Sequence, residues 1–291
     1  MKNGLKIVLL ALALFWPGLV QAEAKKEYPF WRLVAKSVLI VEGTLDVPVA
    51  DIKKAEQNGE HEYLIVKMAV RKNLKGEPES TNLDLRYYTD TETYGGLSRK
   101  SIIALNGKPV VTFLQKVRDN YYLAVYAPET IQPASEALAK RVKQEAAHQE
   151  ILIKASEDYA SGNVLPKETE LQSLIEMMVH KEIDPASAAH VYHALIDLGK
   201  EAVPTIIKYM DDRRKLTIPK ISLAPWWPDA HEGLVHYGPE TVTDVLSVAL
   251  MVLTHEDLTA IYNGGTELER AQAVRIWKIY ERRTYGKPAT P

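Results

Sequence analysis

The chain has 291 residues, of which 46% are hydrophobic and 25% are charged, with 15 Gly, 16 Pro and no Cys. This composition excludes a disordered chain, a collagen and a coiled-coil array, and the length allows one large domain or two domains of about 100 to 200 residues each. The 36 Lys and Arg nearly balance the 38 Asp and Glu without a long block of either sign, so we expect no nucleic-acid partner.

Residues 1–22 have the pattern of a signal peptide. Lys2 and Lys6 form a basic start before an apolar run over residues 7–16, and Pro17-Gly18 end this run shortly before Ala22. The run is shorter than the roughly 20 residues that a membrane helix needs. We therefore expect cleavage near Ala22, a periplasmic or secreted protein, and no stable membrane span after cleavage.

Between Trp31 and Ala127 the apolar runs are short and rich in β-branched and aromatic residues, which is typical of strands. Asn106-Gly107 predicts a hairpin turn between two runs, and Asp119-Asn120 predicts another tight turn. About 100 residues of short strands would leave open edges in a flat sheet, so an antiparallel barrel, closed or partly closed, is expected. The runs are residues 37–45, 63–70, 83–87, 101–105, 110–114 and 121–126.

Three stretches follow one another in this region: Val41-Glu-Gly-Thr44 at the end of the first strand, Val70-Arg-Lys-Asn-Leu-Lys-Gly76 after the second, and Gly107-Lys-Pro-Val-Val-Thr-Phe-Leu114 later. This order resembles the OB-like barrel shared by netrin-type and metalloprotease-inhibitor-like domains. The resemblance covers roughly residues 30–130 and implies that fold. It does not extend to protease inhibition, because the eukaryotic inhibitors depend on an amino-terminal Cys and on disulfides, and this chain has no Cys.

From Pro133 onward the apolar period changes from two to about 3.6 residues, which is the period of an α-helix. Asp184 as N-cap and Pro185 at the first helical position predict the start of a helix that ends at Gly199. About seven helices are expected in this part of the chain. They are placed at residues 136–160, from 171, 185–198, 200–211, from Gly238-Pro239 to Leu253, after a capping box at 254–257, and from Thr266 to Arg283.

The stretch from Ala194 to Asp212 resembles one HEAT repeat. Gly199 lies between its two helices, an Ala-Val-Pro sequence stands early in the second helix, and an acidic pair ends it. A single helix pair cannot cover its own apolar face, so the flanking helices would be degenerate repeats.

The expected fold class is α+β, with an amino-terminal antiparallel OB-like β-barrel followed by an α-helical HEAT-like array. The segment from Ala127 to Pro133 contains two prolines and no apolar period, which predicts an exposed boundary. The expected division is a signal peptide over 1–22, the barrel over 23–130, a connecting helix over 131–165 and the helical domain over 166–291.

His190, His193 and Asp197 are candidate metal ligands. At 100° per residue they lie within about 60° of one another on one helix face, where they could converge on a cation. The alternative is a solvated polar face of a helical array. A second pair, His231 and His236, is separated by five residues, whereas the zinc-protease signature needs four, although a more open site that adds Asp229 is conceivable.

Trp226 and Trp227 stand between two prolines and are candidate binding residues. Their indoles either anchor a loop between repeats or form a partly exposed recognition platform.

Motifs of covalent catalysis are missing from the sequence. The chain contains no Cys, no Gly-x-Ser-x-Gly elbow and no Gly-rich phosphate loop, so we find no catalytic motif and expect no cofactor. The expected function is that of an exported interaction or scaffold module, not an enzyme, whose partner is another protein or an envelope component. The alternative is a metal-dependent hydrolase that uses His residues of the helical domain.

Overall fold

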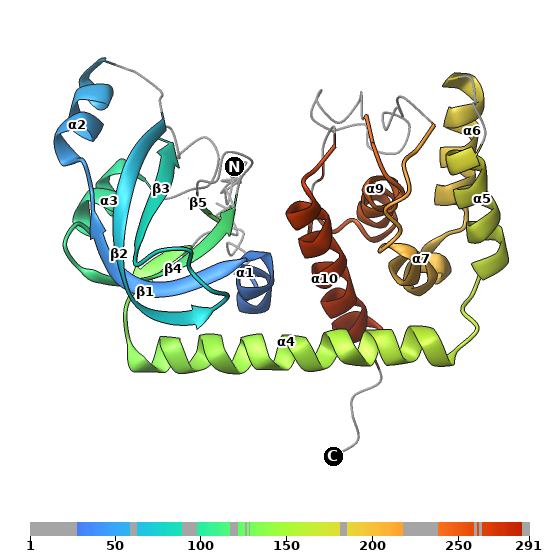
Figure 1. Ribbon diagram of the computed structural model, residues 1–291, viewed down its shortest axis with the longest axis horizontal. Helices are drawn as coiled ribbons and strands as arrows, with labels where there is room; N and C mark the ends of the chain where they lie inside the picture. Colours follow the sequence, from blue (N-terminus) through green and yellow to red (C-terminus); the bar gives the residue numbers. More distant parts are fainter. Residues whose placement is uncertain are drawn as a thin grey trace, which may run out of the picture.

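A computed structural model of the protein describes residues 28–58, 63–88, 98–116, 122–125, 127, 129–180, 185–217, 238–258, 261 and 264–286. A β-barrel and a group of helices lie side by side, and the long helix α4 (Glu136–Gly162) extends along both (Figure 1). The predicted signal peptide lies outside the described residues, as do Asp119-Asn120 and Asp184.

Five strands close the barrel. Each strand pairs with the next in the order β1-β2-β3-β5-β4, and β4 pairs back to β1. The β3–β5 pairing is parallel and the other pairings of the ring are antiparallel. This topology fits an OB-like barrel and confirms the predicted α+β class. It differs from the predicted antiparallel barrel in one parallel pairing, between β3 and β5. The strands are β1 (Leu39–Asp46), β2 (Tyr63–Lys75), β3 (Asn82–Tyr88), β4 (Pro109–Lys116) and β5 (Tyr122–Ala124).

Close approach of β1 and β2 depends on Gly43. A Cβ atom at this position would lie 2.3 Å from the backbone oxygen of Ala69, so any other residue would force the two strands apart. The pairing register shifts at Glu42 and Gly43, which is the mark of a β-bulge and bends the strand. The core inside the barrel includes Leu39, Val41, Leu45, Val66, Met68, Leu83, Leu85, Val110, Leu114 and Tyr122.

The predicted strand at residues 101–105 is wrong, because α3 (Arg99–Ala104) occupies this position. The hydroxyl of Ser98 accepts a hydrogen bond from the Ser101 backbone N–H, at 3.2 Å, and this N-cap favours a helix despite the β-branched residues that follow. The predicted hairpin at Asn106-Gly107 is also wrong, because the element before it is α3 and not a strand. Gly107, with φ 69°, lies between α3 and β4. Two further helices in this half, α1 (Phe30–Lys36) and α2 (Val49–Asn58), were not predicted.

The segment predicted to be an exposed boundary is part of the sheet. Strand β6 (Ile131–Pro133) pairs antiparallel with β4, and Thr130 and Ile131 are 2% and 9% exposed. The apolar side chain of Ile131 packs in the barrel core. The free energy gained by this burial favours an ordered strand over the exposed segment that the two prolines predicted.

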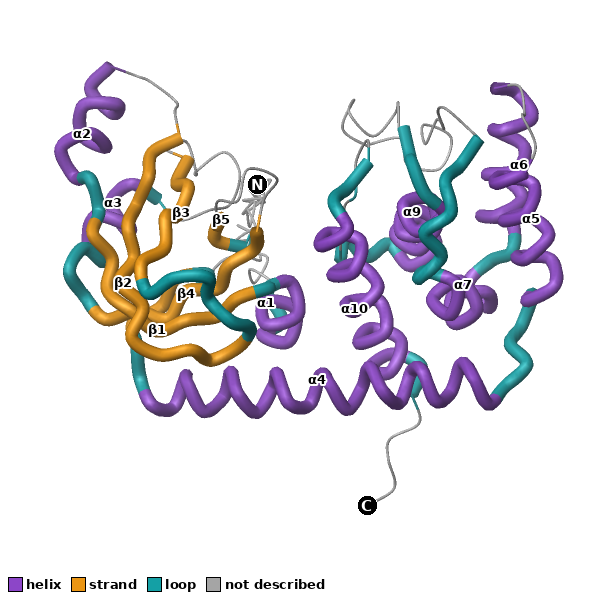
Figure 2. Tube along the Cα trace, in the orientation of Figure 1, coloured by secondary structure: helices purple, strands orange, loops and turns teal. Residues whose placement is uncertain are grey.

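The carboxy-terminal half contains helices close to the predicted ranges (Figure 2). Thr266 and Glu269 form the predicted reciprocal capping box. The predicted capping box at Thr254 is wrong, because Thr254 ends a helix and His255 follows it in a left-handed conformation, with φ 57°. The helices are α5 (Glu168–His180), α6 (Pro185–Asp197), the 3₁₀ helix η1 (Lys200–Ala202), α7 (Val203–Tyr209), α9 (Val242–Thr254) and α10 (Glu267–Thr284).

Helix α1 is packed between the barrel and the helices (Figure 1). Leu33 and Val34 belong to an apolar cluster on the outer face of the barrel that also contains Phe113, whereas Ala35 belongs to the core of the helical region. Helix α4 has the same double role, because Val142 packs against the barrel cluster and Ile153 against the helical core. Both helices therefore connect the two halves through buried apolar contacts.

The carbonyl groups at the end of α1 receive hydrogen bonds from side chains of both halves. Lys75, at the end of β2, donates from Nζ to the carbonyl oxygens of Val34 and Ser37, each at 2.6 Å. Gln272 of α10 donates to the carbonyl oxygen of Ala35. These bonds satisfy groups that a helix end leaves without partners. Burial lowers the pKa of Lys75 to about 8, and the nearby Arg275 acts in the same direction.

We predict that this lysine makes stability depend on pH in the alkaline range. Between about pH 8 and 10.5 the folded state loses the Lys75 proton while the unfolded state still binds it, so the free energy of unfolding rises with pH. Urea unfolding of the parent and of Lys75→Met at pH 7, 8, 9 and 10 measures this effect. The parent should gain stability relative to the variant as the pH rises through this range, and a constant difference would show that the buried lysine is not the cause.

Candidate functional site

The predicted metal ligands all lie on α6 but do not form a site. His190 and Asp197 are exposed and His193 is half-buried. In the part of the chain that the structure describes, no three His, Asp or Glu side chains are grouped so that they could hold a metal ion. The geometry therefore gives the metal-dependent hydrolase no support. Trp226 and Trp227 lie outside the described residues, as do Asp229, His231 and His236.

The outer face of β2 and β3 carries a patch of two exposed side chains, Tyr63 and Ile65, and two half-buried ones, Arg86 and Tyr88. We call Tyr63, Ile65, Arg86 and Tyr88 the β2–β3 patch. In the pairing register Tyr63 is opposite Tyr88 and Ile65 is opposite Arg86, so all four side chains leave the sheet on the same side. Tyr63 is 56% exposed and Ile65 is 37% exposed, so the two form a small apolar area on this face.

The aromatic rings of the patch are held in place by one another. The ring centroids of Tyr63 and Tyr88 are 4.8 Å apart at an interplanar angle of 39°, and the guanidinium of Arg86 lies 5.3 Å from the Tyr63 centroid. Aromatic pairs contribute about 0.5 to 1.5 kcal/mol and exposed cation–π contacts about 0.5 to 1 kcal/mol. Tyr63, Tyr88 and Arg86 therefore stabilise one another's positions on this face.

A polar margin borders the patch along the same strands. Lys67 is opposite Asp84 and Ala69 is opposite Asn82, and all four residues are exposed. Protein interfaces commonly have an aromatic centre with Tyr and Arg, surrounded by a polar rim. On the outer face of β2 and β3, a tyrosine pair and an arginine lie beside the exposed polar residues Lys67, Asp84 and Asn82.

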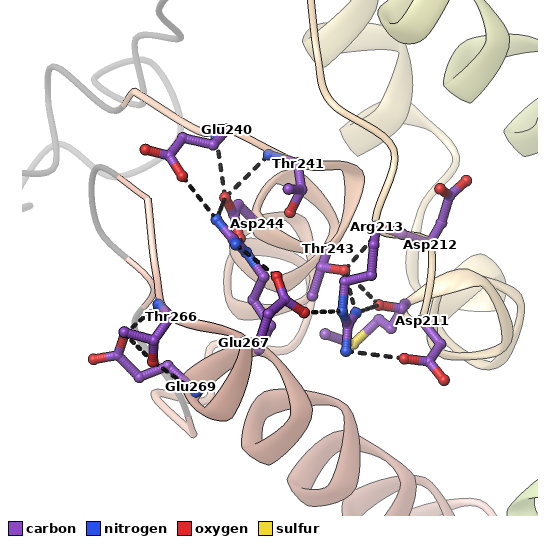
Figure 3. Close-up of polar contacts among 12 residues, drawn as sticks. Asp211, Asp212, Arg213, Glu240, Thr241, Thr243, Asp244, Thr266, Glu267 and Glu269 are labelled. Carbon is purple, nitrogen blue, oxygen red and sulfur yellow. Dashed lines mark hydrogen bonds and ion pairs between the residues drawn. The ribbon is translucent and has the colours of Figure 1, made fainter. Parts of the chain in front are cut away.

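The helical region contains a network of buried charges between α9 and α10 (Figure 3). Arg270 donates from Nε and Nη2 to the two carboxylate oxygens of Asp244, at 2.8 and 3.1 Å. Asp244 is fully buried, and its Oδ2 also accepts from the backbone N–H groups of Glu240 and Thr241. The Arg270 side chain further contacts Glu267 at 3.0 Å, and its pKa is raised by the bond to Asp244.

A second arginine extends this network to α7. Arg213 donates to the backbone oxygen of Met210 at 3.2 Å, to the hydroxyl of Thr243 at 2.6 Å and to the carboxylate of Glu267 at 3.1 Å (Figure 3). The chain segment after α7 is thereby tied to the starts of α9 and α10. Since both oxygens of Asp244 already accept hydrogen bonds, the network has the features of a structural joint and not of a reaction centre.

The chain was compared with protein-family models, with curated proteins and with solved structures, and none of the three comparisons found a match. Within the described ranges, no helix has both the length and the apolar character that crossing a membrane requires.

Sequence reasoning identified β2 and β3 but missed the patch on them. The sequence does contain a signal for the patch, namely the alternation along β2. Its odd-numbered residues from Tyr63 to Ala69 face outward, while Val66 and Met68 are buried. A strand with one solvated face should carry polar residues there, so an outward Tyr63 and Ile65 depart from the usual alternation.

We predict that Arg270→Leu destabilises the protein by roughly 3 to 5 kcal/mol, because it leaves the buried Asp244 carboxylate without its cation. The control is Arg214→Leu, which removes an arginine bonded to Asp212 and Glu176 at the surface and should cost about 1 kcal/mol or less. Urea unfolding followed by circular dichroism gives both values. Equal losses in the two variants would contradict the assignment of the network as a buried joint.

Proposed function

We propose that the protein is an exported interaction module that binds another protein of the cell envelope through the β2–β3 patch. The observation that carries this proposal is the contact of Tyr63 with Tyr88 beside the exposed Ile65 on an outward face of the barrel. Burying such side chains in a complex gains about 25 cal/mol for each Å² of apolar surface removed from water. A tyrosine keeps its hydroxyl available for a hydrogen bond to the partner.

Export is the second part of the proposal, and it depends on the amino-terminal sequence. The basic start, the apolar run and the small residue Ala22 are the features that support a cleaved signal peptide. The mature chain would then begin at Glu23, a few residues before α1, and would reside in the periplasm or outside the cell.

The helical region is proposed to be a HEAT-like array that acts as a scaffold. Gly199, with φ 75°, lies between α6 and η1, and Leu195, Val203 and Ile207 are buried in one core. In HEAT arrays, stacked helix pairs present extended surfaces. Since α1 and α4 pack against both halves, the β2–β3 patch would be held in a fixed orientation relative to this scaffold.

Site-specific photo-crosslinking in cells that produce the protein tests the proposal. A benzophenone amino acid replaces Ile65 in the patch or, as a control, Glu56 on the exposed side of α2. We expect one discrete crosslinked product in the envelope fraction for position 65, none for position 56, and loss of the product when Tyr63→Ser is added. Tyr63→Ser should change the unfolding free energy by no more than about 1 kcal/mol, because the ring is largely exposed.

Two results would contradict the proposal. Equal crosslinking from both positions would mean that the patch has no preference for a partner, and a product that survives Tyr63→Ser would place the contact elsewhere. Amino-terminal sequencing of the crosslinked chain tests export separately, because it should begin at Glu23.

A further inference from the structure

A recess of about 450 Å³ lies where α1, α4 and α10 meet, on elements other than the strands of the β2–β3 patch. Its size is within the range of about 300 to 1,000 Å³ that small-molecule sites occupy. Its wall combines half-buried aromatic side chains with arginines. The lining residues are Phe30, Trp31, Arg141, Gln144, Glu145, His148 and Arg283.

Arg141 is held in position by stacking. Its guanidinium carbon lies 3.8 Å from the centroid of the Phe30 ring, which is a close cation–π contact, and the side chain is exposed to solvent. Phe30 is itself fixed, because it packs edge-on against Phe113 of the barrel, with centroids 6.1 Å apart. Within the described chain, Arg141 has this ring contact and no carboxylate partner.

The other arginine of the recess already has a carboxylate partner. Arg283 donates to Glu145 at 2.6 Å and lies 5.2 Å from the Trp31 ring centroid. Gln149 also donates to Glu145, at 2.8 Å, and to the Trp31 backbone oxygen at 2.9 Å. The negative charge of Glu145 is therefore engaged by Arg283, and the positive charge of Arg141 is left available to a ligand.

Helix α4 places further polar groups next to Arg141. Gln144 and His148 follow it at three and seven residues, so the three side chains lie on one face of the helix. Nδ1 of His148 lies 3.4 Å from Nη2 of Arg283, so Gln144 and the Nε2 atom of His148 can offer hydrogen bonds to a ligand whose charged end is on Arg141. Phe30 and Trp31 provide the apolar wall beside them.

We propose that this recess binds a carboxylate attached to an aromatic or other apolar group. The carboxylate would pair with Arg141 through two parallel N–H···O bonds, because the guanidinium fork matches a planar carboxylate. The apolar part would lie against Phe30 and Trp31. A single unpaired guanidinium with Glu145 nearby favours one negative charge over the two of a phosphate. The carboxylate can belong to a free acid or to the carboxy-terminal residue of a peptide.

Calorimetric titration of the mature full-length protein tests this inference, with N-acetyl-phenylalanine as the probe and N-acetyl-phenylalanine amide as the uncharged comparison. We expect saturable one-to-one binding of the acid and at least tenfold weaker binding of the amide. Arg141→Gln should weaken binding of the acid at least tenfold, and Arg141→Lys should weaken it by less, because lysine keeps the charge but not the fork.

The matched control is Lys143→Gln, which removes the same charge from the same helix two residues away, on a different face. It should leave the affinity unchanged, as should Tyr63→Ser in the β2–β3 patch. Equal binding of acid and amide, unchanged binding to Arg141→Gln, or no binding of the acid at millimolar concentration would each overturn the proposal.

A second probe separates the two sources of the carboxylate. The peptide acetyl-Ala-Ala-Phe with a free carboxy terminus presents the same end group on a longer chain. Tighter binding of this peptide than of N-acetyl-phenylalanine assigns the recess to peptide ends, whereas equal or weaker binding assigns it to a free acid. Both results support the carboxylate site, provided that Arg141→Gln abolishes them.

Discussion

The packing of α1 between the barrel and the helices is the constraint on which the rest of the structure depends. This helix has only seven residues, yet Leu33 and Val34 are buried against the barrel and Ala35 against the helical core. Its final carbonyl groups are bonded to Lys75 from one half and to Gln272 from the other. Since an isolated helix of this length is unstable in water, α1 depends on packing against its neighbours, and it packs against both halves. The two halves are therefore joined by a shared element and not by a flexible linker.

This arrangement determines which surfaces remain available for binding. Helices α1 and α4 cover side chains on the outer faces of β1 and β4 and at the end of β2, whereas Tyr63 and Ile65 near the start of β2 are exposed among the described residues. At the same time, the first residues of α1 supply the aromatic wall of the recess at Arg141. The architecture thus produces two separate candidate surfaces with different chemistry. One is a flat aromatic patch suited to a protein partner, and the other is a small cationic recess suited to a carboxylate.

Periodicity in the sequence predicted the barrel strands and most of the helices, because long apolar patterns depend on the fold as a whole. The prediction failed where a short local signal, such as a helix cap, opposes the preference of the residue types. Ile102 and Ile103 favour a strand by type, but the Ser98 cap makes their segment a helix. The helix α1 was missed because its apolar residues serve two different cores and show no single stripe. The recess was missed because it combines residues from separate elements, such as Phe30 with Arg141, whose proximity no sequence spacing reveals.

Native-state hydrogen exchange tests the central claim most directly, namely that α1 makes the barrel and the helices one cooperative unit. The amides of Val41 in β1 and Leu246 in α9 report on the two halves. The account predicts the same opening free energy for both amides, and a decrease of about 2 to 5 kcal/mol for both in Leu33→Ala, because this side chain is buried in the shared contact. Different opening free energies in the parent, or a decrease confined to the barrel amide in the variant, would contradict it.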